Sequence, residues 1–240
     1  MLQLPVVSRY FFFMPLFFLL RFLPLWFFGF VVPLLVLWVS DLACAAFTFS
    51  PESLTTFSFR SEPAALIERG ADTARALRII RKNAEDYRIN PDHVAFIGFS
   101  NGGLTGDSNI LYFSGEKKLT DYFPDYVPDE LDAYYGAPNA FICVYGPRYN
   151  GSEADYTGVK YPPTFFAVGR EDSAMNNLHW AYPDLVKHGV LVEVHTFAGV
   201  PHGVGGVHLL EEEIRYPNFH LWYKLADCFL EDVYKKQAQE

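Results

Sequence analysis

Charge is almost absent from the first fifty residues of this 240-residue chain. Only Arg9, Arg21 and Asp41 are charged there, whereas the same stretch holds nearly half of the chain's 23 phenylalanines. From about residue 51 onward the composition is that of an ordinary acidic, soluble domain. The sequence therefore predicts two parts: a hydrophobic N-terminal segment over residues 1–44 and a folded domain over residues 45–240.

Cysteine and positive charge are also scarce. The three cysteines, Cys44, Cys143 and Cys228, lie far apart and are odd in number, which excludes a disulfide framework or a cysteine zinc site. A formal net charge of −9 excludes the basic surface that a nucleic-acid partner requires. No carboxylate–histidine spacing of a known metal-binding type occurs, so we expect neither a metal nor an organic cofactor.

Residues 22–40 form an apolar run without a charged side chain, about the length that crosses a bilayer. Arg9 and Arg21 precede this run and Asp41 follows it, which places the N-terminus in the cytoplasm and the domain outside it. The run therefore predicts a transmembrane anchor and a membrane partner.

Other interpretations of the same region stay open. The small residues "ACA" at 43–45 resemble a signal-peptide cleavage site, which would make the domain a secreted protein. An aberrant N-terminus would instead leave the domain in the cytoplasm. The stretch "VVPLLVLWV" at 31–39 also fits a buried sheet strand, because such strands are continuously apolar.

Strand and helix patterns alternate along the domain. A helix is expected over 62–87, where apolar residues recur at helical spacing, and a loop or small cap over 121–135. The expected strands are 89–99, 140–146, 162–169 and 190–197, and further helices are expected after residue 100 and over 179–189 and 219–236. This alternation predicts a mostly parallel sheet flanked by helices.

The stretch "GFSNG" places Ser100 between the end of a strand and the start of a helix. In such a tight turn the serine hydroxyl projects above the sheet, and side chains at Gly98 and Gly102 would collide. The backbone N–H of Asn101 points into the same space, where the helix dipole favours negative charge. Ser100 is therefore a candidate nucleophile, with the Asn101 N–H as an oxyanion donor.

A nucleophilic serine needs a base, and the base needs an orienting acid. Asp172 and His202 each follow a predicted strand, in loops where functional residues concentrate. Asp172 could instead cap the next helix, or Glu171 beside it could serve as the acid. Its spacing from Gly169 favours Asp172.

The histidine also has competitors. His195 lies inside a predicted strand, and His208 lies further along the chain in a possible helix. His202 is favoured over both because its loop is rich in glycine and proline.

The stretches "GFSNGG", "VGREDS" and "FAGVPHGVG", in that order, resemble the α/β-hydrolase superfamily. The segment "RKNAEDYRINPDHVAFIGFSNGG" is similar to small bacterial esterases of the acetyl-xylan or feruloyl esterase-like, lipase-related group. The resemblance covers about residues 60–236. It implies that Ser100 is the nucleophile, His202 the general base and acid, and Asp172 the orienting acid. It also implies that the Asn101 N–H is one oxyanion donor.

The sequence departs from this group upstream of the serine. No histidine precedes His93 and no paired glycines precede Gly102, so the usual His-Gly-Gly oxyanion loop has no counterpart. The stretches "AAFTF" and "LTTFSF" within 45–59 are the last candidates for the early strands. We therefore expect N-terminal strands that are incomplete or replaced by the hydrophobic segment.

The expected function is a serine carboxylic-ester hydrolase with a small-molecule ester substrate. Tyr134 and Tyr135, in a segment that could overhang the pocket, hint at short acyl esters of carbohydrates. A serine peptidase would use the same three residues. The alternative from another class is a weakened or inactive hydrolase-like protein that binds at a membrane. Nothing in the sequence predicts the oligomeric state.

Overall fold

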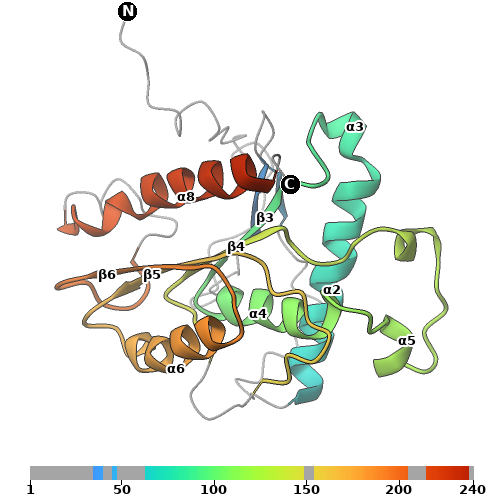
Figure 1. Ribbon diagram of the computed structural model, residues 1–240, viewed down its shortest axis with the longest axis horizontal. Coiled ribbons are helices and arrows are strands. Elements are labelled where there is room, and N and C mark those ends of the chain that lie inside the picture. Colours follow the sequence, from blue (N-terminus) through green and yellow to red (C-terminus); the bar gives the residue numbers. More distant parts are fainter. Residues whose placement is uncertain (1–34, 40–44, 48–62, 149–153, 205–214, 238–240) are drawn as a thin grey trace, which may run out of the picture.

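The architecture is a six-stranded sheet with helices on both faces (Figure 1). This computed structural model describes residues 35–39, 45–47, 63–148, 154–204 and 215–237. The strands are β1 (Leu35–Val39), β2 (Ala45–Phe47), β3 (Val94–Phe99), β4 (Ala140–Val144), β5 (Thr164–Gly169) and β6 (Val192–Phe197). The helices are α2 (Pro63–Lys82), α3 (Ala84–Tyr87), α4 (Asn101–Phe113), α5 (Leu119–Tyr122), α6 (Ala174–Lys187) and α8 (Trp222–Gln237). The 3₁₀ helices within the described residues are η3 (Glu130–Ala133) and η4 (Phe219–Leu221).

The strands lie in the order β2-β1-β3-β4-β5-β6. Strands β3 to β6 pair in parallel, each beside its predecessor in the chain, whereas β1 pairs antiparallel with both β2 and β3. The predicted mostly parallel sheet with flanking helices is therefore confirmed. Because parallel strands end at the same edge, the loops after β3, β5 and β6 can meet there.

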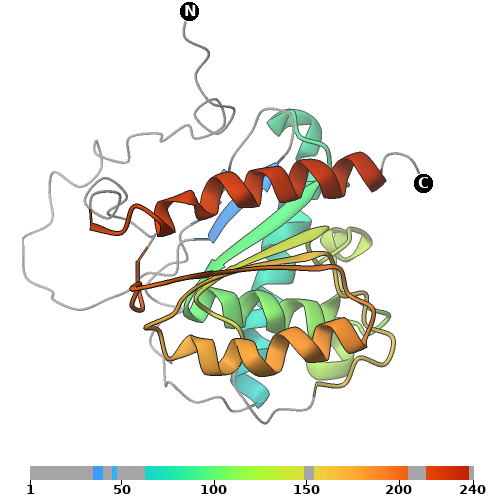
Figure 2. The ribbon, with the colours of Figure 1, turned by 60° about the vertical axis from the view of Figure 1, so that its left-hand side comes forward.

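Alternate residues of the buried strands pack into two separate cores. Ala95 and Ile97 of β3 face helix α8, whereas Val94 and Phe96 face helices α2, α4 and α6. Figure 2 shows these layers, with α8 on one side of the sheet and α4 and α6 on the other. The period-two alternation explains why these strands read as continuous apolar runs: both faces are covered.

The apolar run 22–40 ends in a sheet strand. Its only described part, residues 35–39, forms β1, whose residues Val36 to Val39 pair with β3. The alternative of a sheet strand is thus correct for these five residues, and a membrane helix reaching residue 40 is wrong for them. Residues 1–34 lie outside the described part of the chain.

Among the described helices, none is both long enough and apolar enough to cross a membrane.

Strand β1 also lies close to the predicted boundary between residues 44 and 45, which separates the hydrophobic segment from the domain. β1 lies before that boundary and β2 after it, and the two strands pair with each other. The sheet thus includes residues on both sides of the boundary. Of the candidate early strands within 45–59, Ala45–Phe47 forms β2 and residues 48–59 lie outside the described residues.

Helix α6 differs from its prediction. It begins at Ala174 rather than 179, and Pro183 lies inside it rather than near its start. Its apolar residues Ala174, Leu178, Ala181 and Leu185 recur at helical spacing and are buried against the sheet. Burial of this face outweighs the hydrogen bond that the proline removes, and Pro183 itself is exposed.

Candidate active site

Ser100 occupies a strained turn between β3 and α4. Its φ of 51° and ψ of −119° lie in a region that residues with a side chain rarely adopt. Two backbone hydrogen bonds hold it there: the Ser100 N–H donates to the Val144 carbonyl at 3.0 Å, and the Ser100 carbonyl accepts from the Gly103 N–H at 2.9 Å. The turn projects the hydroxyl away from the sheet, as the nucleophile prediction requires.

The turn requires glycine at positions 98 and 103, whereas the sequence predicted positions 98 and 102. A Cβ on Gly98 would lie 2.3 Å from the Gly102 carbonyl oxygen, so this glycine is required as expected. A Cβ on Gly102 would meet no atom within 4 Å, so the predicted collision there is wrong. The crowded position is Gly103, whose Cβ would lie 2.4 Å from the Gly146 carbonyl oxygen. That contact comes from β4's end, far away in the sequence.

The three predicted side chains form one hydrogen-bonded row. The Ser100 Oγ lies 2.9 Å from His202 Nε2, and His202 Nδ1 lies 2.8 Å from Asp172 Oδ2. Because a carboxylate only accepts, Nδ1 carries the proton and Nε2 is free to accept the serine hydroxyl. This arrangement can remove a proton from the hydroxyl and stabilise the imidazolium that forms.

Asp172 both holds the histidine and caps a helix. Its side chain is completely buried, and Oδ1 accepts a hydrogen bond of 2.8 Å from the Ala174 N–H at the start of α6. Both sequence interpretations of Asp172 therefore apply at once. Glu171 is exposed, and the acidic partner found for His202 among the described residues is Asp172.

The loops that carry Asp172 and His202 are tied together. The Arg170 N–H donates to the Phe197 carbonyl at 2.8 Å, and the Glu171 N–H donates to the Val200 carbonyl at 3.1 Å. A Cβ on Gly169 would lie 2.0 Å from the same Val200 oxygen. The loop after β6 therefore lies directly against the end of β5, which explains the spacing of Asp172 from Gly169.

Of the two competing histidines, the one that the structure describes, His195, does not join this row. His195 lies on β6, with Nε2 2.7 Å from Glu193 Oε1 and its ring against Phe165. His208 falls within residues 205–214, outside the described residues.

The Asn101 N–H is the first of helix α4. The leading N–H groups of a helix have no carbonyl partner within it, and they carry the positive end of the helix dipole. Strand β1 pairs antiparallel with β3. The amino end of β1, near Leu35, therefore lies beside the carboxyl end of β3, where Ser100 follows. The residues that precede Leu35 lie outside the described part of the chain.

One residue of the site was missed by the sequence analysis. The Tyr145 ring contacts the His202 ring edge-to-face, with centroids 4.9 Å apart and planes at 70°. Tyr145 directly follows the buried strand β4, where an aromatic residue normally indicates core packing. Its φ of 42°, a positive value unusual for a residue with a side chain, is a signal that only the structure provides.

The aromatic, acidic segment 121–135, which could have overhung the pocket or packed as a small cap, packs beside α2 and does not overhang Ser100. Ion pairs tie Asp129, Glu130 and Asp132 to the helix α2 side chains of Arg75, Lys82 and Arg78. The carbonyl of Tyr135 accepts from Arg81, which also binds Asn139 just before β4 begins. The segment therefore lies beside α2 at the amino ends of the strands, away from the triad, with α5 on the outside of α2 (Figure 1).

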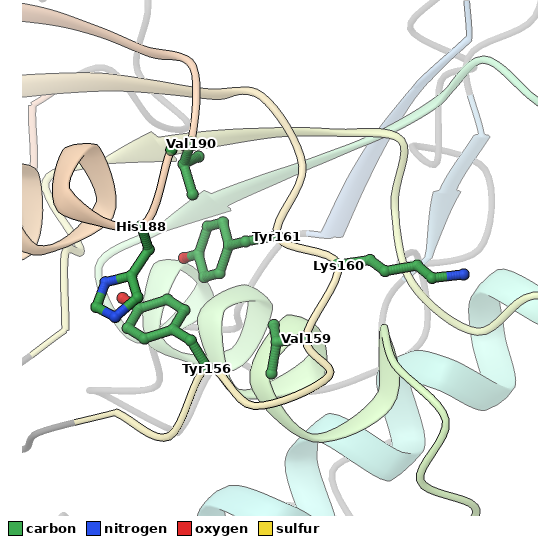
Figure 3. A pocket seen from close by; sticks show the side chains of 7 residues that line it. Tyr156, Val159, Lys160, Tyr161, His188 and Val190 are labelled. Carbon is green, nitrogen blue, oxygen red and sulfur yellow. The ribbon is translucent and has the colours of Figure 1, made fainter.

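A cavity of about 270 Å³ also lies at the amino ends of the strands. Figure 3 shows the rings of Tyr156 and His188, which are stacked, side by side in its lining, with Tyr161 and Val190 next to them. The hydroxyls of Tyr156 and Tyr161 are bound to Asp184 and Asp107, so this aromatic cluster joins α4 and α6. No group of metal-ligating side chains occurs among the residues that the structure describes.

Solved structures share this architecture. An acetyl ester-xyloside bifunctional hydrolase from Caldicellulosiruptor lactoaceticus is 24% identical, with a TM-score of 0.57 over 80% of this chain and 72% of its own. A carboxylesterase from Lactobacillus plantarum is 17% identical, with a TM-score of 0.55 over 79% of this chain and 74% of its own. Esterase 2 of Thermogutta terrifontis, phosphorylated by paraoxon, is 21% identical, with a TM-score of 0.54 over 80% of this chain and 70% of its own.

No protein-family model matches the chain, and no curated protein matches it. At sequence identities this low, the similarity establishes a shared fold alone. The chain therefore has the α/β-hydrolase fold, and the resemblance seen in the sequence is confirmed at that level.

Proposed function

We propose that the chain is a serine carboxylic-ester hydrolase. The observation that carries this proposal is the hydrogen-bonded row of Ser100, His202 and Asp172 in an α/β-hydrolase fold. His202 takes the hydroxyl proton as Ser100 Oγ attacks the ester carbonyl, and Asp172 stabilises the imidazolium. The Asn101 N–H binds the developing oxyanion. His202 then protonates the leaving alcohol, and water hydrolyses the acyl-enzyme.

The structural neighbours support this chemistry. They include esterases, and one of them is an esterase phosphorylated by paraoxon. Paraoxon should therefore phosphorylate the Ser100 Oγ of this chain, with p-nitrophenol as the leaving group.

For the substrate, we propose short acyl esters of carbohydrates within the wider class of small esters. The support is the neighbour described as an acetyl ester-xyloside hydrolase. Tyr134 and Tyr135 no longer contribute to this proposal, because their segment packs beside α2. A comparison of acetylated xylo-oligosaccharides with p-nitrophenyl acetate tests the substrate class separately from the reaction.

The reaction itself is tested on the full-length chain beside Ser100→Ala. We expect p-nitrophenyl acetate hydrolysis and a paraoxon mass adduct in the first protein and neither in the second. Equal, near-background rates in both proteins, with no adduct, would instead favour the non-catalytic binding protein.

A further inference from the structure

We infer that Tyr145 is a positioning residue that holds the His202 imidazole in line with Ser100. This inference rests on the proposed function. The Tyr145 ring meets the His202 ring edge-to-face with centroids 4.9 Å apart, while Asp172 holds the Nδ1 side of the imidazole. Two contacts from different directions fix both the position and the tilt of the ring.

His202 needs such a second contact. Val200 and Val204 are buried on either side of it, but the His202 side chain between them is 49% exposed. Its neighbour Gly203 has a φ of 85°, so the backbone turns sharply there. A hydrogen bond to Asp172 alone lets the imidazole pivot about that bond, and Nε2 would then swing away from Ser100 Oγ.

Tyr145 is itself firmly held. Its N–H donates to the Ala167 carbonyl at 2.8 Å, and its buried ring packs against Phe99 with centroids 5.9 Å apart. Phe99 in turn meets Trp222 of α8 edge-to-face at 5.6 Å. This aromatic row links the start of α8 to the catalytic imidazole, so the ring that touches His202 has little freedom to move.

The backbone of Tyr145 is in a conformation that disfavours any side chain. A φ of 42° is unfavourable for any residue with a Cβ, whereas glycine adopts it freely. An aromatic residue at such a position points to a role for the side chain itself.

The turn 144–146 touches both the nucleophile and the base. Val144 accepts the Ser100 N–H, and a Cβ on Gly146 would lie 2.1 Å from the Ser100 carbonyl oxygen. Tyr145, between them, contacts His202. One short segment at the end of β4 therefore sets the distance between the Ser100 turn and the His202 ring.

The test compares variants of Tyr145 in the full-length protein. Tyr145→Leu and Tyr145→Met remove the ring but keep apolar volume, and Tyr145→Phe keeps the ring without the hydroxyl. Phe229→Leu is the matched control, because Phe229 belongs to the same core cluster but packs on Phe165. The measurements are the rate constant of paraoxon phosphorylation of Ser100, kcat and KM for p-nitrophenyl acetate, and thermal unfolding.

We expect Tyr145→Leu and Tyr145→Met to lower kcat and the paraoxon rate about 10- to 100-fold, with KM nearly unchanged. Tyr145→Phe should retain the wild-type rates. Phe229→Leu should lose stability comparably without losing rate. Wild-type rates in folded Tyr145→Leu or Tyr145→Met overturn the inference, and so does an equal loss in Tyr145→Phe.

Proton NMR gives a readout that does not depend on esterase activity. The His202 Nδ1–H, bound to Asp172, should give a slowly exchanging downfield resonance in the wild type and in Tyr145→Phe. In Tyr145→Leu this proton should exchange faster, and the ring-current shifts of the imidazole carbon protons should disappear. If the wild type neither hydrolyses esters nor reacts with paraoxon, the proposed function fails, and the NMR comparison still decides the role of Tyr145. Unchanged His202 resonances in Tyr145→Leu overturn that role.

Discussion

At the scale of single residues, the turn around Ser100 separates glycines that are required from one that is not. Alanine at Gly98 or Gly103 would force a Cβ to within 2.3 or 2.4 Å of a carbonyl oxygen of the backbone. We expect each substitution to lower the free energy of unfolding by about 1–3 kcal/mol or more, since backbone must move. Gly102→Ala is the matched control: it meets no atom within 4 Å and should be neutral or slightly stabilising in the helix. Denaturant unfolding measures all three, and equal losses at Gly102 and Gly103 would contradict the geometry.

The two adjacent acidic residues after β5 make a second comparison. Asp172→Asn keeps the shape but favours the wrong imidazole tautomer, so kcat for p-nitrophenyl acetate should fall about 10³- to 10⁴-fold. Glu171→Gln, on the neighbouring exposed side chain, should keep kcat within about twofold, because the contact that the structure describes for Glu171 is made by its backbone N–H. The reverse ranking in steady-state kinetics would assign the acid role to Glu171.

At the scale of elements, Arg148 joins two helices. It is buried after β4 and forms ion pairs with Asp107 of α4 and Asp184 of α6. Arg148→Met leaves Asp107 buried without its cation, and we expect a loss of about 3–5 kcal/mol in denaturant unfolding. Adding Asp107→Asn should recover part of this loss, because the uncompensated charge is removed.

The control for that substitution is Arg75→Met. Arg75 pairs with Asp129 on the surface, where such pairs contribute about 1 kcal/mol or less. If Arg148→Met were no worse than Arg75→Met, the buried pairs would have no structural role. Simple addition of the Arg148 and Asp107 losses would contradict the coupling between them.

Helix α8 carries a carboxyl group that opposes folding at neutral pH. Burial raises the pKa of Asp227, and the charge of Glu231 one turn further on raises it too. A raised pKa means that the folded state prefers the protonated form of Asp227. The contribution of this group to the free energy of unfolding is therefore fully present below the ordinary carboxyl pKa of about 3.9. That contribution is lost as pH rises through the folded-state pKa.

Asp227→Asn should therefore raise the melting temperature at pH 7, and the gain should shrink as pH falls towards 4. Thermal unfolding across this range measures the difference. The control is Asp232→Asn on the same helix, where Asp232 is exposed and pairs with Lys236, so the change should stay within about 0.5 kcal/mol. A gain for Asp227→Asn that does not depend on pH would contradict the burial argument.

The sequence predicted the elements well where local signals dominate. β3, β4, β5 and β6 were expected because they are short apolar runs bounded by turns. The start of helix α6 was misplaced because Pro183 was expected near the beginning of a helix, and packing against the sheet overrides that local preference. The segment 121–135 could not be placed, since ion pairs across about fifty positions of sequence fix it on α2.

At the scale of the whole molecule, strand β1 defines which part of the chain is needed for the sheet. A chain that begins at residue 45 lacks β1 and leaves one edge of β3 unpaired. We expect it to be less stable by several kcal/mol than a chain that begins at residue 30, because each unpaired buried backbone group costs about 1–3 kcal/mol. Urea unfolding of the two proteins measures the difference. Equal stabilities would show that β1 does not pair with β3 in solution.

The residues of the site were predictable to different degrees. Ser100, Asp172 and His202 each follow a strand in the order of the resembled superfamily, so the sequence alone selected them, and the structure brings them together. Tyr145 and Gly103 were not recognised, because their contacts depend on β4 lying beside β3. The strand at 35–39 was one of several alternatives, since a continuous apolar run does not distinguish a sheet strand from part of a membrane helix.

The strand order also describes how the sheet can be assembled. Each described strand, taken in chain order, joins an outer edge of the strands already formed: β2 and β3 flank β1, and then β4, β5 and β6 follow in turn. No strand has to be inserted between two that are already paired, so the sheet can grow during synthesis without breaking earlier contacts. His202 follows β6, the last strand that the structure describes, and the row with Ser100 and Asp172 closes only when that strand is in place. Reactivity at Ser100 would then report that β6 and the loop after it have joined the sheet in a newly made chain.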